Sequence, residues 1–529
     1  MTCNGEILTR VADEAAPAAD PTGVTYVSRG AVLVFGPSRL VLPAARALAP
    51  GLRVLAGVRE DVPATRADAN PAVMTAVVAQ VEGYLGRFRI MVHAGAGKQV
   101  DLGPFSPNRD GQFDLVLDLD VAPSIAVDIA PPGYFAPGDD PQRIAEAVAE
   151  LKSLVGTFRK PRYFQFDAVL CAHIAQGVTG CTRCIAACPA GAIRPGPTAV
   201  DVDPYLCQGC STCVLACPTG AITPARPVAR PTRPAADGRA VLLIVEDGDN
   251  PVGASLVSSS ASTTTQSVSA IGMTGIAMWL EALANGFDQV IVRAPPALPP
   301  STRAQLSAQI ALAQALLRAV GRPDSGVVLE DGATGNVTTV MSVPPGDLAA
   351  LASDRPGPAT GRPALMGSLA QLEGPRGPAS LRTPHPLPPG APFGAIEVNR
   401  DTCTLCLACV NLCPTGALAG TQPRRELEFV EERCVQCGIC ERGCPEQAIR
   451  LEPRLLVPVA ARSQPRSLNE DQPHRCTACG TAFISRAMLA KGIQIMQQHQ
   501  TLDEAGVAVL RLCPACRAAR LTESLLQPQ

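Results

Sequence analysis

Apolar residues in the first part of the chain form short runs separated by an amphipathic segment. Residues 30–57 read GAVLVFG, then an apolar-periodic stretch, then LRVLAGV, and strand-like runs follow at 88–93 and 113–120. Buried strands that alternate with an amphipathic helix are typical of a layered α/β fold. We therefore expect a small α/β domain over residues 25–140.

The same pattern predicts a second α/β domain over residues 238–340. Val241–Val245 and Gln289–Arg293 have the composition of buried strands. Ala304–Val320 repeats apolar residues at three- and four-residue steps, which indicates a helix. The polar stretch SSSASTTTQS at 258–267 is expected to be a loop.

Two stretches have the composition of connectors. TPARPVARPTRPAA at 223–236 is rich in proline and arginine. Residues 343–394 hold twelve prolines between Pro344 and Pro392. Proline-rich segments of this kind favour extended chain, so we expect a poorly ordered linker over 343–394.

Charge and hydropathy exclude several classes of protein. Lys and Arg number 45 and Asp and Glu 47, so no concentrated basic face for nucleic acid is expected. The first twenty residues lack the charged-then-apolar pattern of a secretion signal. Charged residues interrupt the longest apolar runs, so we expect no membrane insertion. A cytoplasmic protein in a reducing compartment is predicted.

The informative count is 21 cysteines, of which 19 stand in tight clusters. Clustered cysteines in a reducing compartment more often bind metal than form disulfides. Four segments also repeat one another: CPAGAI at 188–193, CPTGAI at 217–222, CPTGAL at 413–418 and CPEQAI at 444–449. Four copies in two pairs indicate two homologous modules, at 160–224 and 395–453. They are called module one and module two below.

Cysteine spacing indicates what the modules bind. The run C-x2-C-x2-C-x3-C-P is typical of bacterial ferredoxins: three thiolates hold one Fe4S4 cubane and the fourth holds its neighbour. Two zinc ions in a cross-brace are the alternative for eight cysteines, but the closing Cys-Pro and the three-residue gap are not zinc-finger features. Three runs fit without deviation: Cys207, Cys210, Cys213, Cys217; Cys403, Cys406, Cys409, Cys413; and Cys434, Cys437, Cys440, Cys444.

The first run of module one departs from this pattern. Cys181, Cys184 and Cys188 are in place, but Val178 stands where the first cysteine belongs. The nearest candidate is Cys171, separated from Cys181 by AHIAQGVTG. We expect this insertion to deliver Cys171 as the missing ligand. The alternative is that Cys171 is a buried thiol and the cluster is labile or holds three irons.

Because the fourth cysteine of each run serves the partner cubane, the ligands are expected to cross within each module. The expected ligand sets are cluster one, Cys171, Cys181, Cys184 and Cys217; cluster two, Cys188, Cys207, Cys210 and Cys213; cluster three, Cys403, Cys406, Cys409 and Cys444; cluster four, Cys413, Cys434, Cys437 and Cys440.

A separate four-cysteine module is predicted over residues 474–522. Two knuckles, Cys476/Cys479 and Cys513/Cys516, provide four sulfurs for one tetrahedral ion. A helical segment is expected near 485–497 in the long loop between them. Zinc in a structural, zinc-ribbon-like site is favoured, and a single iron is the alternative.

No catalytic signature accompanies the cysteines. The loop around Gly95-Ala96-Gly97-Lys98 lacks the first glycine and the Ser/Thr of a phosphate loop. No dinucleotide fingerprint follows the strand at 31–35, and no nucleophile–base pair is recognisable. These absences favour a carrier over an enzyme.

The motifs quoted above resemble bacterial-type 2[4Fe-4S] ferredoxin domains over 171–222 and 395–452. CAHIAQGVTGCTRCIAACPAGAI, together with the C-terminal four cysteines, is similar to 4Fe-4S proteins associated with formate dehydrogenases and molybdenum reductases. IGMTGIAMWLEALANGFDQVIV is similar to the iron–sulfur subunit of hydrogenase–heterodisulfide reductase systems, although residues 238–340 hold no cysteine.

The resulting expectation is a multidomain α/β and α+β protein with two dicluster modules, four [4Fe-4S] clusters and one zinc. It would be a soluble polyferredoxin that passes single electrons to or from a redox enzyme such as a formate dehydrogenase or molybdenum reductase. Two alternatives remain open: a flavin- or nucleotide-binding oxidoreductase subunit, and a maturation or docking factor for a molybdoenzyme.

Overall fold

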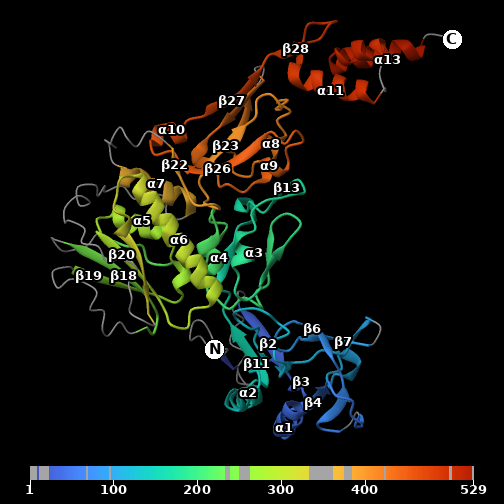
Figure 1. Cartoon of the computed structure of the whole chain (residues 1–529), viewed down its shortest axis with the longest axis vertical. Coiled ribbons are helices and arrows are strands. Elements are labelled where there is room, and N and C mark those ends of the chain that lie inside the picture. Colours follow the sequence, from blue (N-terminus) through green and yellow to red (C-terminus); the bar gives the residue numbers. More distant parts are fainter. Residues whose placement is uncertain are drawn as a thin grey trace.

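The computed structural model describes residues 9–10, 23–66, 69–94, 97–232, 239–249, 262–332, 361–373, 384–421, 425–499 and 503–526. Figure 1 shows the first α/β domain at one end of the molecule and the C-terminal four-cysteine module at the other. Modules one and two lie between these ends, and the second α/β domain lies beside them. No helix in the described ranges is both long enough and apolar enough to cross a bilayer.

The first α/β domain is built on a parallel sheet with the strand order β10-β9-β3-β4-β5. Its central strand, β3, is buried along its whole length because all six of its side chains are apolar or absent. Helix α1 packs on one face of the sheet through Val41, Ala45 and Leu48, which lie on successive turns of one side of the helix. The elements are β3 (Ala31–Gly36), α1 (Ser38–Leu48), β4 (Arg53–Val58), β5 (Ala72–Thr75), β9 (Leu115–Asp118) and β10 (Tyr134–Phe135).

Two small antiparallel sheets complete this domain, with the orders β1-β11-β2 and β6-β7-β8. The domain extends past residue 140, where the sequence analysis ended it, because Leu151 of α2 and Phe158 of β11 lie in the same core as β3. The elements are β1 (Thr9–Arg10), β2 (Val24–Ser28), β6 (Val78–Glu82), β7 (Arg89–His93), β8 (Gln99–Asp101), α2 (Pro141–Ser153) and β11 (Gly156–Lys160).

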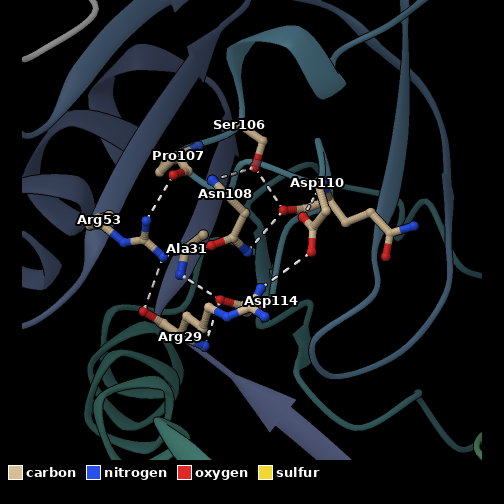
Figure 2. Close-up of polar contacts among 9 residues, drawn as sticks. Arg29, Ala31, Arg53, Ser106, Pro107, Asn108, Asp110 and Asp114 are labelled. Atoms are coloured by element: carbon tan, nitrogen blue, oxygen red, sulfur yellow. Dashed lines mark hydrogen bonds and ion pairs between the residues drawn. The ribbon is translucent and has the colours of Figure 1, made fainter.

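A polar network closes the amino end of the β3–β9 pair (Figure 2). The buried Asp114 carboxylate accepts hydrogen bonds from the backbone amides of Arg29 and Ala31, at 2.8 and 2.9 Å. Arg53 donates to the Asn108 side chain at 2.6 Å. Buried polar groups are stable only when they have partners, so this network fixes the loop over 106–114 against the sheet.

Module one consists of short strands and two one-turn helices that carry the cysteines. Helix α3 holds Cys184 and helix α4 holds Cys213. The insertion before Cys181 forms a two-residue hairpin, β13–β14. The elements are β12 (Phe164–Phe166), η2 (Ala168–Leu170), β13 (Ile174–Ala175), β14 (Val178–Thr179), α3 (Arg183–Ala187), β15 (Ile193–Pro195), β16 (Val200–Val202), α4 (Thr212–Ala216) and β17 (Ile222–Pro224).

The second α/β domain has a parallel sheet with the order β19-β18-β20-β21. Part of the stretch expected to be a polar loop, 262–267, is the edge strand β19, and 258–261 lies outside the described residues. Threonine is favoured in strands, and an edge strand exposed on one side tolerates polar residues. The elements are β18 (Ala240–Glu246), β19 (Ser262–Val268), η3 (Ile271–Met273), α5 (Ile276–Ala284), β20 (Gln289–Ala294), α6 (Pro300–Ala319), η4 (Asp324–Gly326) and β21 (Val327–Asp331).

The expected linker over 343–394 is wrong for its middle part. Residues Gly361–Glu373 form α7, and residues 343–360 and 374–383 lie outside the described residues. Leu365, Leu369 and Leu372 of α7 are buried in the core of the second α/β domain. Apolar residues at helical spacing outweigh the proline-rich composition of the flanks.

Module two repeats the design of module one, and the C-terminal module follows it. The elements of module two are β22 (His385–Pro386), β23 (Gly394–Val398), α8 (Ala408–Leu412), β24 (Leu418–Thr421), β25 (Arg425–Phe429), η7 (Glu431–Arg433), α9 (Ile439–Arg442) and β26 (Ile449–Leu455), followed by α10 (Val459–Ser463) and β27 (Arg466–Asp471). The C-terminal module holds β28 (Pro473–Arg475), β29 (Ala482–Ser485), α11 (Arg486–Gln498), α12 (Glu504–Leu510) and α13 (Pro514–Leu526).

Candidate metal centres

Two equivalent cavities lie in the two modules, and each is lined by four cysteines. In module two the cavity is lined by the cysteines expected at cluster three: Cys403, Cys406, Cys409 and Cys444. In module one it is lined by the cysteines expected at cluster one: Cys171, Cys181, Cys184 and Cys217. Cys171 therefore lines the cavity of module one as Cys403, the first cysteine of its run, lines the cavity of module two.

The cysteines expected at clusters two and four also lie near one another. Burial raises the pKa of Cys210 to about 12, and the nearby Cys188 and Cys207 thiols add to the rise. Burial likewise raises the pKa of Cys437 to about 11, with Cys434 and Cys413 among its neighbours. Cysteines from both runs of a module thus meet, as crossed ligation requires.

The raised pKa values of the buried thiols indicate that these sites need a compensating positive charge. Burial raises the pKa of Cys184 and of Cys409 to about 12 in each case, and neighbouring thiols contribute further. Four thiolates cannot share an apolar cavity unless a cation compensates their charge. Iron–sulfur clusters are bound by thiolates, so binding a cluster would release these protons and supply the compensating charge.

Backbone conformation distinguishes the three complete runs from the first one. In each complete run, the residue before the second cysteine and the residue after it have left-handed backbone conformations, as Leu405 and Leu407 do on either side of Cys406. These two turns direct the first three cysteines of the run toward one cavity. Thr182, between Cys181 and Cys184, has φ −122° instead. The other left-handed residues of the complete runs are Gly209, Ser211, Gln436 and Gly438.

Hydrogen bonds reach the sulfurs from backbone amides of the repeats and from two polar side chains between the cysteines. The amide of Ala192 donates to Cys188 Sγ at 3.3 Å, and the amide of Ala448 donates to Cys444 Sγ at 3.4 Å. The Thr212 hydroxyl donates to Cys210 Sγ at 3.3 Å, and the Gln436 amide donates to Cys434 Sγ at 3.3 Å. Donors to sulfur raise the reduction potential of a cluster because they stabilise its more negative state.

Lys160 is a residue that the sequence analysis missed. It lies on β11 of the first α/β domain, is 5 % exposed, and donates from Nζ to the backbone oxygens of Cys207 at 2.7 Å and Tyr205 at 2.8 Å. Burial lowers its pKa to about 8, and the Cys207 thiol opposes the shift. No motif marks this lysine, because its partner lies 47 residues further along the chain.

Arg362 was missed because it falls within the expected linker. From the first turn of α7 it donates to the backbone oxygen of Cys434 at 2.6 Å and to that of Glu432 at 2.9 Å. Burial lowers the pKa of Arg362 to about 10, which leaves the guanidinium charged at neutral pH. A fixed positive charge therefore lies against the loop that begins at Cys434.

The C-terminal cysteines form a different kind of site. The sulfurs of Cys476, Cys479, Cys513 and Cys516 all lie within 4.8 Å of one another, with Cys479 and Cys513 3.6 Å apart. A zinc ion with bonds of about 2.3 Å to four sulfurs holds those sulfurs about 3.8 Å apart. These four residues therefore fit one tetrahedral ion.

Hydrogen bonds within this site shift the pKa values of its thiols in opposite directions. Those from the backbone, first from Cys513, lower the pKa of Cys476 to about 6, and those with neighbouring thiols, first Cys479, raise the pKa of Cys516 to about 12. Among the described residues, which include every module cysteine, no three other His, Cys, Asp or Glu side chains come as close together.

Comparison with known proteins identifies the two modules. The family described as the 4Fe-4S dicluster domain matches residues 179–222 and 402–449. The chain therefore contains two 4Fe-4S dicluster domains, and the resemblance of both modules to ferredoxins is confirmed.

Curated relatives match the chain over short stretches. The ferredoxin-like protein YdhY of Escherichia coli is 33% identical over 58 residues, 11% of this chain and 28% of that relative. The polyferredoxin-like subunit of the aliphatic sulfonate oxidoreductase of Pyrococcus furiosus is 38% identical over 61 residues, 11% of this chain and 35% of that subunit. A Methanocaldococcus jannaschii ferredoxin is 29% identical over 136 residues, 25% of this chain and 77% of the ferredoxin. The chain thus spans only about a third of the first two relatives.

Proposed function

We propose that this protein is an electron carrier that holds four [4Fe-4S] clusters and passes single electrons between them and a redox enzyme. The observation that carries the proposal is the gathering of cysteines from both runs of each module, with Cys171 beside Cys181 in module one. The ligands would be the four crossed sets expected from the sequence. The clusters supply the one-electron chemistry, and the chain positions them and sets their potentials.

The C-terminal four-cysteine site would hold one structural zinc. The mutual approach of its sulfurs supports a single ion rather than a cubane. Ser485, at the start of α11, donates to the backbone oxygen of Thr404 at 2.6 Å. Because Thr404 follows Cys403, the C-terminal module lies next to the ligand loop of cluster three, with one hydrogen bond between them.

The partner would be a cytoplasmic oxidoreductase. Relatives named as a polyferredoxin-like subunit of a sulfonate oxidoreductase and as a subunit of pyruvate synthase support this class of partner. The similarity of the first cysteine block to proteins associated with formate dehydrogenases and molybdenum reductases favours one of those enzymes.

One observation favours a carrier over a nucleotide-binding subunit. In parallel α/β folds, phosphate groups bind at the start of the helix after the first strand. At the start of α1, the amide of Ser38 instead donates to the Glu60 carboxylate at 2.9 Å. A carboxylate at this position would repel a phosphate.

Metal and sulfide analysis of anaerobically purified protein, followed by redox titration, tests the proposal. Four cubanes give about 16 iron and about 16 acid-labile sulfide per chain, all reducible in one-electron steps. About one zinc per chain is expected in addition. Zinc without sulfide in the two modules would contradict the electron-carrier function.

A further inference from the structure

The insertion that separates Cys171 from Cys181 contacts the other module. Its hairpin, β13–β14, ends at Thr179, whose backbone oxygen accepts a hydrogen bond of 2.7 Å from Arg442 Nε. Arg442 ends α9 and also donates, from Nη2, to the backbone oxygen of Cys437 at 2.8 Å. One guanidinium thus joins the insertion of module one to a ligand loop of cluster four.

Packing at this contact is tight. A Cβ placed on Gly180 would lie 2.5 Å from Cγ1 of Ile439, so only glycine lets α9 approach the chain here. Val178 lies on the same hairpin and occupies the position at which a ferredoxin run would carry cysteine. A Cβ placed on Gly443 would lie 3.5 Å from Cγ2 of Val178. The insertion between Cys171 and Cys181, which breaks the ferredoxin spacing, is therefore a part of module one that contacts module two.

A second bridge links other ligand loops of the same two clusters, one and four. The first turn of α7 lies against Gly220, since a Cβ placed on that glycine would lie 3.1 Å from Cα of Gly361. Gly220 belongs to the turn that follows Cys217 of cluster one. The next residue of α7, Arg362, donates to the backbone oxygen of Cys434 of cluster four.

We infer that the β13–β14 insertion and the first turn of α7 make clusters one and four the adjoining pair, so that electrons follow one path in the order two, one, four, three. The inference rests on the proposed electron-carrier function. At the junction one electron leaves reduced cluster one, which is oxidised, and enters oxidised cluster four, which is reduced. No bond breaks and no proton moves, and the partner redox enzyme supplies or removes the electron.

Packing of the cysteine-bearing helices agrees with this order. Within module one, α3, which holds Cys184 of cluster one, contacts α4, which holds Cys213 of cluster two. Within module two, α8, which holds Cys409 of cluster three, contacts α9, which holds Cys440 of cluster four. Helix α9 also contacts β14 of the insertion, so each neighbouring pair in the proposed path is joined by packed elements.

Electron paramagnetic resonance of the intact, fully reduced protein tests the path. Magnetic interaction is expected between clusters one and four, in addition to the interaction within each module. To isolate that pair, Cys213→Ser is combined with Cys409→Ser to disrupt the outer clusters two and three, and an iron content of about eight per chain verifies their loss. The remaining two clusters should still show spin–spin splitting. Two reducible clusters with no interaction would overturn the path and leave the electron-carrier function intact, whereas absence of reducible clusters in the wild-type protein would overturn both.

Arg442→Ala tests the insertion with all four clusters in place. We expect the interaction between clusters one and four to weaken at least severalfold, while the interactions within the modules remain. The matched control is Arg433→Ala, which removes an arginine that donates to Gly416 inside module two. An unchanged inter-module interaction in Arg442→Ala, with normal iron content, would overturn the role of the insertion. If that variant loses iron, Arg442→Lys is measured instead, and it must show the same weakening.

Discussion

Modules one and two receive a buried cation at the same point of the repeat, but from different parts of the chain. Cys207 and Cys434 each begin the second run of their module. The backbone oxygen of Cys207 accepts a hydrogen bond from Lys160, and that of Cys434 accepts one from Arg362. Lys160 is the last residue of β11, a strand of the first α/β domain, and Arg362 comes from α7, a helix that packs in the second α/β domain. The same electrostatic requirement is thus met twice without a shared motif.

Their surroundings differ more than their ligands do. Module one is covered by the second α/β domain: a Cβ on Gly272 of η3 would lie 2.4 Å from the backbone oxygen of Cys210, and Thr302 of α6 hydrogen-bonds Thr212 at 2.7 Å. Module two also contacts that domain, through Arg362 of α7, and in addition it carries the C-terminal module on the loop that holds Thr404. Three of the four cysteine runs thus share one backbone geometry, while different neighbours give the two modules different environments.

The largest effect is expected from removing the first ligand of each module. Cys171→Ser and Cys403→Ser should each lower the iron content by about one to four atoms, since serine oxygen is a poor ligand for a cubane. The other three clusters should stay reducible in both variants. Iron analysis and electron paramagnetic resonance compare the two directly. A normal cluster in Cys171→Ser but not in Cys403→Ser would mean that Cys171 is a bystander.

Removing the C-terminal metal should affect one module and spare the others. Cys476→Ser is expected to lose the zinc and unfold residues 474–522, because a four-thiolate zinc site supplies local folding free energy. The iron content should remain at about 16 per chain. Zinc analysis and limited proteolysis measure the two effects. Gly492→Ala on α11 is the control, since a Cβ there meets nothing within 4 Å. Loss of a redox-active iron signal in Cys476→Ser would mean that the site holds a single iron and not zinc.

Neutralising the two buried cations should shift the potentials of two different clusters. A positive charge stabilises the more negative, reduced cluster, so Lys160→Met should lower the potential of cluster two and Arg362→Met that of cluster four. The expected shifts are on the order of tens of millivolts. Lys160→Arg and Arg362→Lys keep the charge and should shift less. Redox titration followed by electron paramagnetic resonance measures each value, and equal potentials for Lys160→Met and wild type would contradict the electrostatic role.

The smallest effect concerns the cover over module one. Glu246, at the end of β18, accepts a hydrogen bond from the Ile271 amide of η3 at 3.0 Å, and burial raises its pKa to about 7. The folded state then binds more protons than the unfolded state between about pH 4.5 and about pH 7, so stability falls as the pH rises through this range.

Glu246→Gln should remove that pH dependence. Above about pH 7 the variant should be more stable by on the order of 1 kcal/mol, a value reduced for the part of the carboxyl that water screens. Hydrogen exchange of the β18 amides at about pH 5 and about pH 8.5 measures the difference. A wild-type protein whose β18 protection is equal at both pH values would contradict the raised pKa of Glu246.

What the sequence by itself determined is local. Cysteines with two residues between them bind one centre, and the cysteine of the closing Cys-Pro binds the neighbouring centre. The binding motifs of the modules and of the C-terminal site could therefore be recognised without a structure. The alternation of apolar runs similarly predicted the strands β3, β18 and β20 and the helix α6.

The tertiary structure decided everything that depends on distant parts of the chain. Composition alone suggested a linker where α7 packs, because proline-rich segments flank this short apolar helix on both sides. Lys160 and Arg362 are ordinary residues in sequence, and only folding brings them to the Cys207 and Cys434 carbonyls. The contact between Thr179 and Arg442 joins residues 263 positions apart. No periodicity or spacing encodes such a pair, because it exists only once both modules have folded and packed together.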